Sequence, residues 1–157
     1  MNYFLTEEQE MLKELCAQIA KEKILPVRAE YDESGEFPWD IVKVMADSDI
    51  YGVYIPEEYG GSGYSFVELG IVLEEMGRAL LCAPFFSSAV LAANTLLQSG
   101  DEDAKQKYLP GIASGETIAT LAYTEPSGKW DESGITMEAT KSGDGYTLTG
   151  TKSFVLD

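Results

Sequence analysis

The sequence has 157 residues, of which 45% are hydrophobic and 11% aromatic, so it can form a folded core and is not disordered throughout. It carries 27 acidic but only 11 basic residues, a formal net charge of −16, so nucleic-acid phosphates and anionic lipid surfaces would repel it. The absence of histidine excludes a His-based catalytic triad and a His zinc site within these residues.

The two cysteines, Cys16 and Cys82, are too few for a disulfide scaffold or a Cys-rich zinc site. We expect both to be buried as small apolar side chains, and we predict no metal site. The first eight residues lack the basic and apolar regions of a signal peptide, and no apolar run is long enough to cross a bilayer. These features predict a soluble, cytoplasmic protein without nucleic-acid or membrane partners.

Up to about residue 113, apolar residues recur at helical spacing. The segment TEEQ at 6–9 has the form of a capping box and predicts that a first helix begins at Thr6. That helix should kink or end near Pro26, because proline has no backbone donor. After a loop at 33–36, Pro38 predicts the first turn of a second helix, since proline is favoured there.

The next segment, residues 51–63, has three glycines within four positions and predicts an exposed loop with a tight turn. A second capping box, SFVE at 65–68, predicts the start of a third helix. A fourth helix, from about Phe85 to Ser99, is apolar on nearly every side, as expected of a central helix. Asp101 then predicts the cap of a fifth helix.

From Thr117 onward the apolar period changes from helical to two, which is typical of strands. We predict strands at 117–124, 135–141 and 146–156, the last two joined by a hairpin turn at 142–145. The expected fold class is mainly α: a helical amino-terminal domain over residues 1–113, followed by the first antiparallel strands of an incomplete β-domain at 114–157. An open edge of this kind predicts pairing with another chain, as in a dimer.

Two stretches carry more specific information. The first is IPEEYGGSG at 55–63, ahead of the capped helix that ends in EEMGR at 74–78. The second is AYTEPSGKWD at 122–131, followed by GYTLTGTK at 145–152. In this order, and over essentially the whole chain, they resemble the acyl-CoA dehydrogenase family, whose pattern is a strand ending in Thr-Glu-Pro, a Gly/Ser-rich turn, an Asp and a hairpin ending in Gly-x-Lys.

The resemblance implies a flavoprotein that uses FAD to oxidise an acyl-CoA thioester to its α,β-enoyl form, in fatty acid or lipid metabolism. A base removes the α-proton while the β-hydride moves to flavin N5. Members have a helical amino-terminal domain, a middle β-barrel and a carboxyl-terminal four-helix bundle, of which this chain matches the first and the opening of the second. The resemblance also implies a homo- or hetero-oligomer and an electron-transfer flavoprotein-type acceptor.

For the cofactor site, the resemblance implies that Thr124 donates to the flavin, with Leu121 and Tyr123 beside the ring. The end of a strand suits this role, because its backbone N–H and C=O groups and a fixed hydroxyl can recognise the polar edge of a planar flavin.

Four further positions implied for the cofactor depart from the family pattern. Trp130 stands where the family usually has a Ser that holds the FAD pyrophosphate, and Lys129 stands where it has a Gly. Phe154 and Leu156 stand where it has an aromatic residue and a Thr against the isoalloxazine. Trp130 cannot supply the small hydroxyl and Leu156 cannot form a hydrogen bond, whereas Lys129 is either a cation for the pyrophosphate or a solvated turn residue.

No catalytic residue is predicted in this chain. The family base is a Glu of the carboxyl-terminal bundle, so Glu125 is interpreted as structural. Three functions stay open at this point: the amino-terminal part of an FAD-dependent acyl-CoA dehydrogenase, inactive by itself; a non-catalytic subunit of a hetero-oligomeric one, which the residues at 129, 130 and 156 favour; and a helical interaction module whose β tail pairs with a partner.

Overall fold

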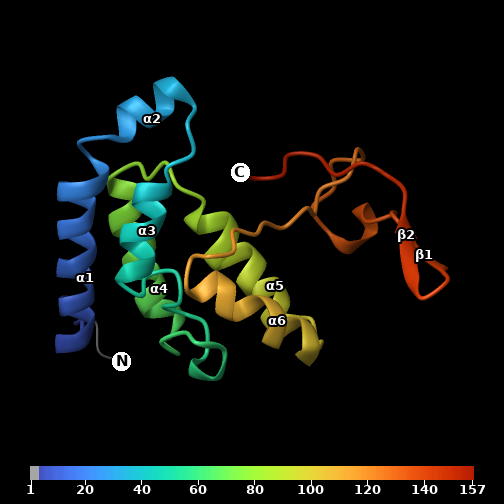
Figure 1. Cartoon of the computed structure of the whole chain (residues 1–157), viewed down its shortest axis with the longest axis horizontal. Coiled ribbons are helices and arrows are strands. Elements are labelled where there is room, and N and C mark those ends of the chain that lie inside the picture. Colours follow the sequence, from blue (N-terminus) through green and yellow to red (C-terminus); the bar gives the residue numbers. More distant parts are fainter. Residues whose placement is uncertain (1–3) are drawn as a thin grey trace. The chain divides into compact units, whose positions relative to one another are not determined.

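A computed structural model describes residues 4–157 and divides the chain into two units, the first reaching to Ala119 and the second running from Thr120 to Asp157 (Figure 1). Residues 1–3, on which part of the signal-peptide expectation rests, lie outside the described residues. The first unit is helical and the second contains one antiparallel hairpin, which confirms the mainly α fold class.

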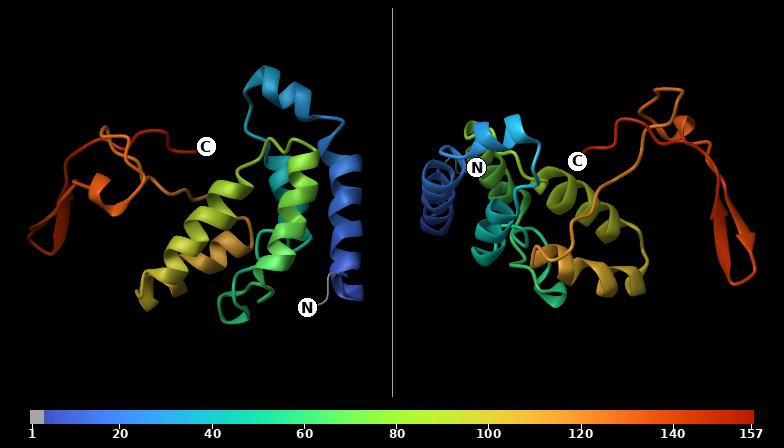
Figure 2. Two further views of the ribbon diagram at one scale, coloured as in Figure 1. Left: turned by 180° about the vertical axis from the view of Figure 1, so that it is seen from behind. Right: turned by 45° about the horizontal axis from the view of Figure 1, so that its top comes forward.

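The first unit is built from helices and short helical turns. In chain order they are α1 (Glu7–Ile19), η1 (Ala20–Ile24), α2 (Arg28–Ser34), α3 (Trp39–Asp47), η2 (Glu57–Tyr59), α4 (Phe66–Arg78), η3 (Phe86–Ala92), α5 (Ala93–Gln98) and α6 (Glu102–Ala113). The turns η1 and η3 are π-helical. Helix α1 packs against α4, and α5 packs against α6, as the two views of Figure 2 also show.

The predicted helix starts are confirmed. The N–H of Gln9 donates to the Thr6 hydroxyl at 3.2 Å, and the Thr6 N–H donates to the Gln9 side chain at 2.9 Å. Ser65 and Glu68 form the same reciprocal box at the start of α4. The two boxes are also joined to each other, because Gln9 Nε2 donates to Glu68 Oε1 at 2.7 Å. This bond fixes the starts of α1 and α4 side by side.

Between α1 and α3 the structure adds a helix that the sequence did not predict. The first helical run continues as η1 to Ile24, just before Pro26. The short helix α2 then follows and ends at Gly35, whose φ of +69° is in the left-handed region. None of the residues of α2 is buried, so it lacks the apolar stripe by which a helix is recognised in a sequence.

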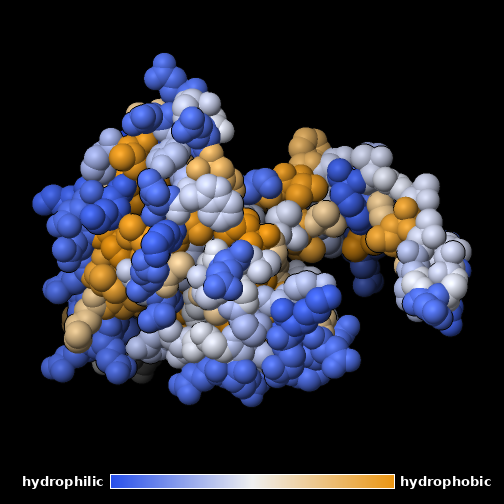
Figure 3. All heavy atoms as spheres, viewed as in Figure 1, coloured by the Kyte–Doolittle hydropathy of each residue, from blue (hydrophilic) through white to orange (hydrophobic). Residues whose placement is uncertain are grey.

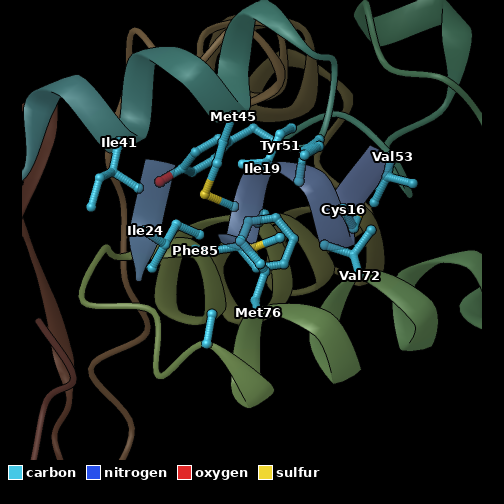
Figure 4. Close-up of a cluster of buried hydrophobic side chains, with 14 of the residues drawn as sticks. Cys16, Ile19, Ile24, Ile41, Met45, Tyr51, Val53, Val72, Met76 and Phe85 are labelled. Atoms are coloured by element: carbon cyan, nitrogen blue, oxygen red, sulfur yellow. The ribbon is translucent and has the colours of Figure 1, made fainter. Parts of the chain in front are cut away.

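The main core lies between α1, α3 and α4, whose apolar side chains point toward one another in Figure 4. The ring of Tyr51 meets that of Phe85 edge to face there, with centroids 5.5 Å apart. A smaller cluster unites the loop at 51–63 with the later helices; its buried members are Ile55, Tyr59, Ala92, Ala93, Leu109, Ile112 and Ala113.

The loop at 51–63 was predicted to be exposed, and that prediction is wrong for most of its apolar residues, although Glu57 and Glu58 are exposed. Tyr51, Val53, Ile55 and Tyr59 are all at most 4% exposed. The glycines allow this burial, because the chain folds back on itself: a Cβ at Gly61 would lie only 2.0 Å from the carbonyl oxygen of Ile55. The loop therefore contributes to both apolar clusters.

The fourth and fifth helices agree with the sequence. The run predicted at 85–99 is present as η3 and α5, and Gly100 follows it with a φ of +74°. The Ala104 N–H donates to the Asp101 side chain at 2.9 Å, which confirms the predicted cap of α6. In the space-filling view of Figure 3, hydrophilic side chains cover much of the rim of the helical unit, and hydrophobic ones show between its helices.

The second unit contains the turn η4 (Glu132–Gly134) and strands β1 (Ala139–Ser142) and β2 (Gly145–Leu148). The strands are antiparallel, with Ala139 opposite Leu148, and both are exposed along their whole length. The predicted hairpin at 142–145 is confirmed. The predicted strand at 117–124 and the continuation of the last strand to 156 are wrong, because neither has a neighbouring strand to pair with among residues 4–157.

The last three residues of the first unit, 117–119, are held to its helices by hydrogen bonds. The Thr117 N–H donates to the carbonyl of Gly111 at 2.8 Å, and the Ala119 N–H donates to the buried Ser88 hydroxyl at 3.2 Å. The domain division at residues 113 and 114 stays a prediction.

The two cysteines differ in their surroundings. Cys16 is fully buried on α1, as predicted, whereas Cys82 is half-buried in the connection between α4 and η3 rather than in a helix. No helix within residues 4–157 is long and apolar enough to cross a membrane.

Candidate functional site

Thr124 lies at the end of an extended segment of the second unit and is half-buried. Its carbonyl accepts a hydrogen bond from the Ser153 N–H at 2.7 Å. Its own N–H and hydroxyl form no hydrogen bond with any residue of the described range 4–157. Thr124 is thus held through its acceptor while its two donors stay available to a ligand.

Glu125, the next residue, is 4% exposed and accepts four hydrogen bonds. Its Oε2 accepts from the N–H and the hydroxyl of Thr136, at 2.8 and 2.6 Å. Its Oε1 accepts from the Met137 N–H at 3.0 Å and from Lys152 Nζ at 2.8 Å. The bond from Lys152, followed by those from Thr136 and Met137, lowers the pKa of Glu125 from 4.5 to about 2. A carboxylate satisfied in this way is a poor proton acceptor near neutral pH.

Lys152 completes the arrangement from the other side of the hairpin. Its side chain is one-fifth exposed, and its Nζ also donates to the carbonyl of Tyr123 at 3.2 Å. Lys152 therefore holds both residues that flank Thr124. We use the name Glu125–Lys152 clasp for these two side chains with their partners on Tyr123, Thr136 and Met137.

The remaining predicted site residues are distributed along the second unit. Leu121 and Tyr123 are half-buried, on the same extended segment as Thr124. Phe154 and Leu156 follow Ser153 and are 88% and 48% exposed. The Leu156 carbonyl accepts from the Thr120 hydroxyl at 2.8 Å, which keeps this end of the chain beside the segment that carries Thr124.

Lys129 and Trp130 lie in the turn before η4. Lys129 Nζ is 3.4 Å from the Ser133 hydroxyl, and Trp130 is 85% exposed. The turn is tight, because a Cβ at Gly134 would lie 2.8 Å from the Lys129 carbonyl oxygen. No hydrogen bond joins this turn to Thr124 within residues 4–157.

Similarity to known proteins shows the family of the chain. The family model described as acyl-CoA dehydrogenase, N-terminal domain, matches residues 6–116. The chain belongs to the acyl-CoA dehydrogenase family.

Individual relatives extend the match to the second unit. The probable acyl-CoA dehydrogenase YngJ of Bacillus subtilis is 36% identical over all of this chain and 42% of its own length. The solved complex of glutaryl-CoA dehydrogenase with glutaryl-CoA is 30% identical, with a TM-score of 0.88, over 99% of this chain and 40% of that one. In the ChsE4–ChsE5 complex of Mycobacterium tuberculosis, the matching chain is 29% identical, with a TM-score of 0.84, over 99% and 42%. The acyl-CoA dehydrogenase segment described here thus spans 40–42% of the length of these relatives.

The chemistry of the side chains suits one part of FAD better than the other. Thr124 offers two unpaired donors to the polar edge of a flavin, and the exposed ring of Phe154 could lie against its plane. At the expected pyrophosphate position, Trp130 presents an indole in place of a hydroxyl, and Lys129 is the nearby cation. The residues therefore fit the flavin edge, whereas the pyrophosphate contacts differ from the family pattern.

Sequence reasoning missed the clasp. Lys152 was part of the recognised motif but had no role, and Thr136, Met137 and Ser153 carried no signal of their own. The available clue was that Glu125 and Lys152 both belong to the stretches that carry the family resemblance.

Proposed function

We propose that this chain forms the flavin-edge part of an FAD-dependent acyl-CoA dehydrogenase, which oxidises an acyl-CoA thioester to its α,β-enoyl product. The observation that carries the proposal is Thr124, held through its carbonyl with its N–H and hydroxyl unpaired. The glutaryl-CoA complex among the similar structures supports the acyl-CoA substrate class. FAD, when bound, supplies the acceptor for the hydride.

The role of the chain's own residues is to bind and orient the cofactor. The two donors of Thr124 would bind the flavin edge, and the apolar parts of Leu121, Tyr123 and Phe154 would exclude water beside the ring. Lys129 would offset part of the pyrophosphate charge.

The chain does not supply the base in this proposal. Glu125 lies nearest to Thr124 in sequence, but its four hydrogen bonds and its pKa of about 2 oppose proton uptake near neutral pH. Proton abstraction is assigned to another part of the protein. The proposal also includes an oligomeric enzyme of fatty acid metabolism in the cytoplasm, with an electron-transfer flavoprotein-type acceptor.

The test is a titration of the purified protein with FAD, followed by the quenching of flavin fluorescence. We expect saturable quenching by the wild-type protein and about fivefold to tenfold weaker binding by Thr124→Val, which removes one hydrogen-bond donor. The control Thr140→Val makes the same change on the exposed strand β1 and should bind FAD like the wild type. Absence of quenching by the wild type would exclude a flavin site formed by this chain without a different partner chain.

A second candidate is a subunit that contributes to a shared site in a hetero-oligomer. The indole of Trp130 and the side chain of Leu156 stand where hydroxyls are expected, and the ChsE4–ChsE5 structure contains two different chains. The ratio of FAD to protein in the assembled enzyme distinguishes the two candidates. One FAD per copy of this chain supports the first, whereas binding that requires a different partner chain supports the second.

A further inference from the structure

The second unit is held together by polar contacts rather than by an apolar core. None of the apolar side chains of residues 120–157 is buried, and both strands are exposed along their length. Glu125 is the one side chain of this unit that is buried. Because a buried carboxylate without partners is costly, its four hydrogen bonds strongly favour one arrangement of the chain around it.

That arrangement brings three separate segments together. Glu125 binds Thr136 and Met137 on the approach to β1, and Lys152 after β2. Lys152 binds the Tyr123 carbonyl as well, at 3.2 Å. Lys152 therefore contacts the residues on both sides of Thr124, and the backbone at 136–137 contacts the one that follows it.

Three consecutive residues are consequently fixed. The carbonyl of Tyr123 is held by Lys152, the carbonyl of Thr124 by the Ser153 N–H, and the side chain of Glu125 by the rest of the clasp. Every one of these contacts leaves the N–H and hydroxyl of Thr124 unused. Held in this way, the two donors lose little conformational freedom when a planar acceptor binds.

We infer that Glu125 and Lys152 are positioning residues for the flavin, which act by holding Thr124 in its binding geometry. This inference rests on the proposed function, since it assigns the reason why Thr124 can recognise the flavin edge. Neither residue touches the cofactor in this scheme. The pKa of about 2 keeps Glu125 ionised at neutral pH, so its carboxylate can accept all four hydrogen bonds of the clasp there.

The test is a double-mutant cycle on FAD affinity in the purified protein. Lys152→Met keeps the length of the side chain but removes both donated hydrogen bonds, and we expect it to weaken FAD binding about tenfold. In a Thr124→Val background the same change should cost less than about threefold, because the hydroxyl that Lys152 helps to position is already missing. The control Lys141→Met removes an exposed lysine of β1 and should leave the affinity within about twofold of the wild type.

Two further variants test the same point. Glu125→Gln replaces one acceptor oxygen by an amide donor that faces other donors, and should give the same non-additive pattern with Thr124→Val. Lys152→Arg keeps a cation with several donors and should recover part of the lost affinity. The visible absorption band of bound FAD should show the same change in Thr124→Val and in the clasp variants.

The outcomes separate the two hypotheses. If wild-type protein binds no FAD, the proposed function and this inference both fall. If it binds FAD but the single effects simply multiply, Glu125 and Lys152 do not act through Thr124, and only the inference falls. If both clasp variants lose the dispersed amide NMR signals of residues 120–157, the clasp is a folding element rather than a positioning device, and the inference is again overturned.

Discussion

Gly61→Ala should destabilise the helical unit strongly, because Gly61 lies where the loop at 51–63 folds back on itself. An added Cβ would lie 2.0 Å from the carbonyl oxygen and 2.5 Å from the carbonyl carbon of Ile55. Ile55 is fully buried, and its carbonyl accepts the Gly63 N–H at 2.9 Å. The clash is with backbone atoms, so it cannot be relieved by rotating a side chain.

The cost can be estimated from its two parts. Overpacking at a buried site costs roughly 1–3 kcal/mol, and here the upper end applies because the backbone must move. Loss of the Gly63 hydrogen bond adds about 1 kcal/mol, while the smaller entropy of an unfolded chain with Ala returns up to about 1 kcal/mol. We therefore expect the free energy of unfolding to fall by about 3 kcal/mol.

The matched control is Gly70→Ala on α4. Gly70 is exposed in the helix interior, and a Cβ there would meet no atom within 4 Å. Ala is the better helix former, so this variant should gain roughly 0.5–1 kcal/mol. The same chemical change should thus have opposite signs at the two positions.

Urea denaturation followed by far-UV circular dichroism measures both variants. In thermal melts, about 3 kcal/mol corresponds to a midpoint lowered by roughly 10 °C for a chain of this size. A loss smaller than about 1 kcal/mol for Gly61→Ala would refute the reasoning, because it would mean that the loop can move away from Ile55 at little cost.

Three further predictions follow from the contacts described above. Burial raises the pKa of the Cys16 thiol to about 12, so a thiol reagent should label Cys82 alone in the native protein at neutral pH; labelling of both before unfolding would contradict this. Asp101→Ala should lower the free energy of unfolding in urea by about 1 kcal/mol, since α6 loses its cap; an unchanged midpoint would be contrary to the role assigned. Hydrogen bonds, the largest effect being that of Ser65, lower the pKa of Glu68 in the folded protein from 4.5 to about 2. In the unfolded chain Glu68 therefore takes up a proton at a higher pH than in the folded protein, and the free energy of unfolding should fall as the pH drops from about 4.5 to 2. Glu68→Gln should make unfolding less dependent on pH in that range, and an identical acid profile would count against the assignment.

The helix starts could be predicted because a cap depends on its nearest neighbours in the sequence. Thr6, Ser65 and Asp101 each bond to a residue within three positions, so the pattern contains the whole interaction. The short helix α2 could not be found in this way, since none of its residues is fully buried and its one core contact, Tyr31, leaves no period to detect.

Two features could not be predicted, because each depends on residues far away in the sequence: the burial of the loop at 51–63, and the lack of strands beyond β1 and β2 among residues 4–157. Glycines indicate a turn, but only the folded chain shows that the turn presses Gly61 against Ile55. Strand-like composition at 117–124 does not supply a neighbouring strand, and without one no ladder forms.

In the candidate site, too, sequence neighbours could be interpreted and distant partners could not. The motif around Thr124 indicated the family together with the stretch at 55–63, whereas the reason for its conformation lay in Lys152, which is separated from Glu125 by 27 positions. No local pattern connects two residues at that distance. The exposed positions of Trp130 and Phe154 also follow from the folded second unit rather than from their residue types.

The separation of 27 positions between the members of the ion pair also imposes an order on biosynthesis. Glu125 leaves the ribosome before Lys152, so the intervening hairpin must emerge and fold back before the Lys152 ammonium group can reach the Glu125 carboxylate. A nascent chain stalled inside that hairpin would already contain the Thr-Glu-Pro motif and still lack the contacts that Lys152 makes with Tyr123 and Glu125.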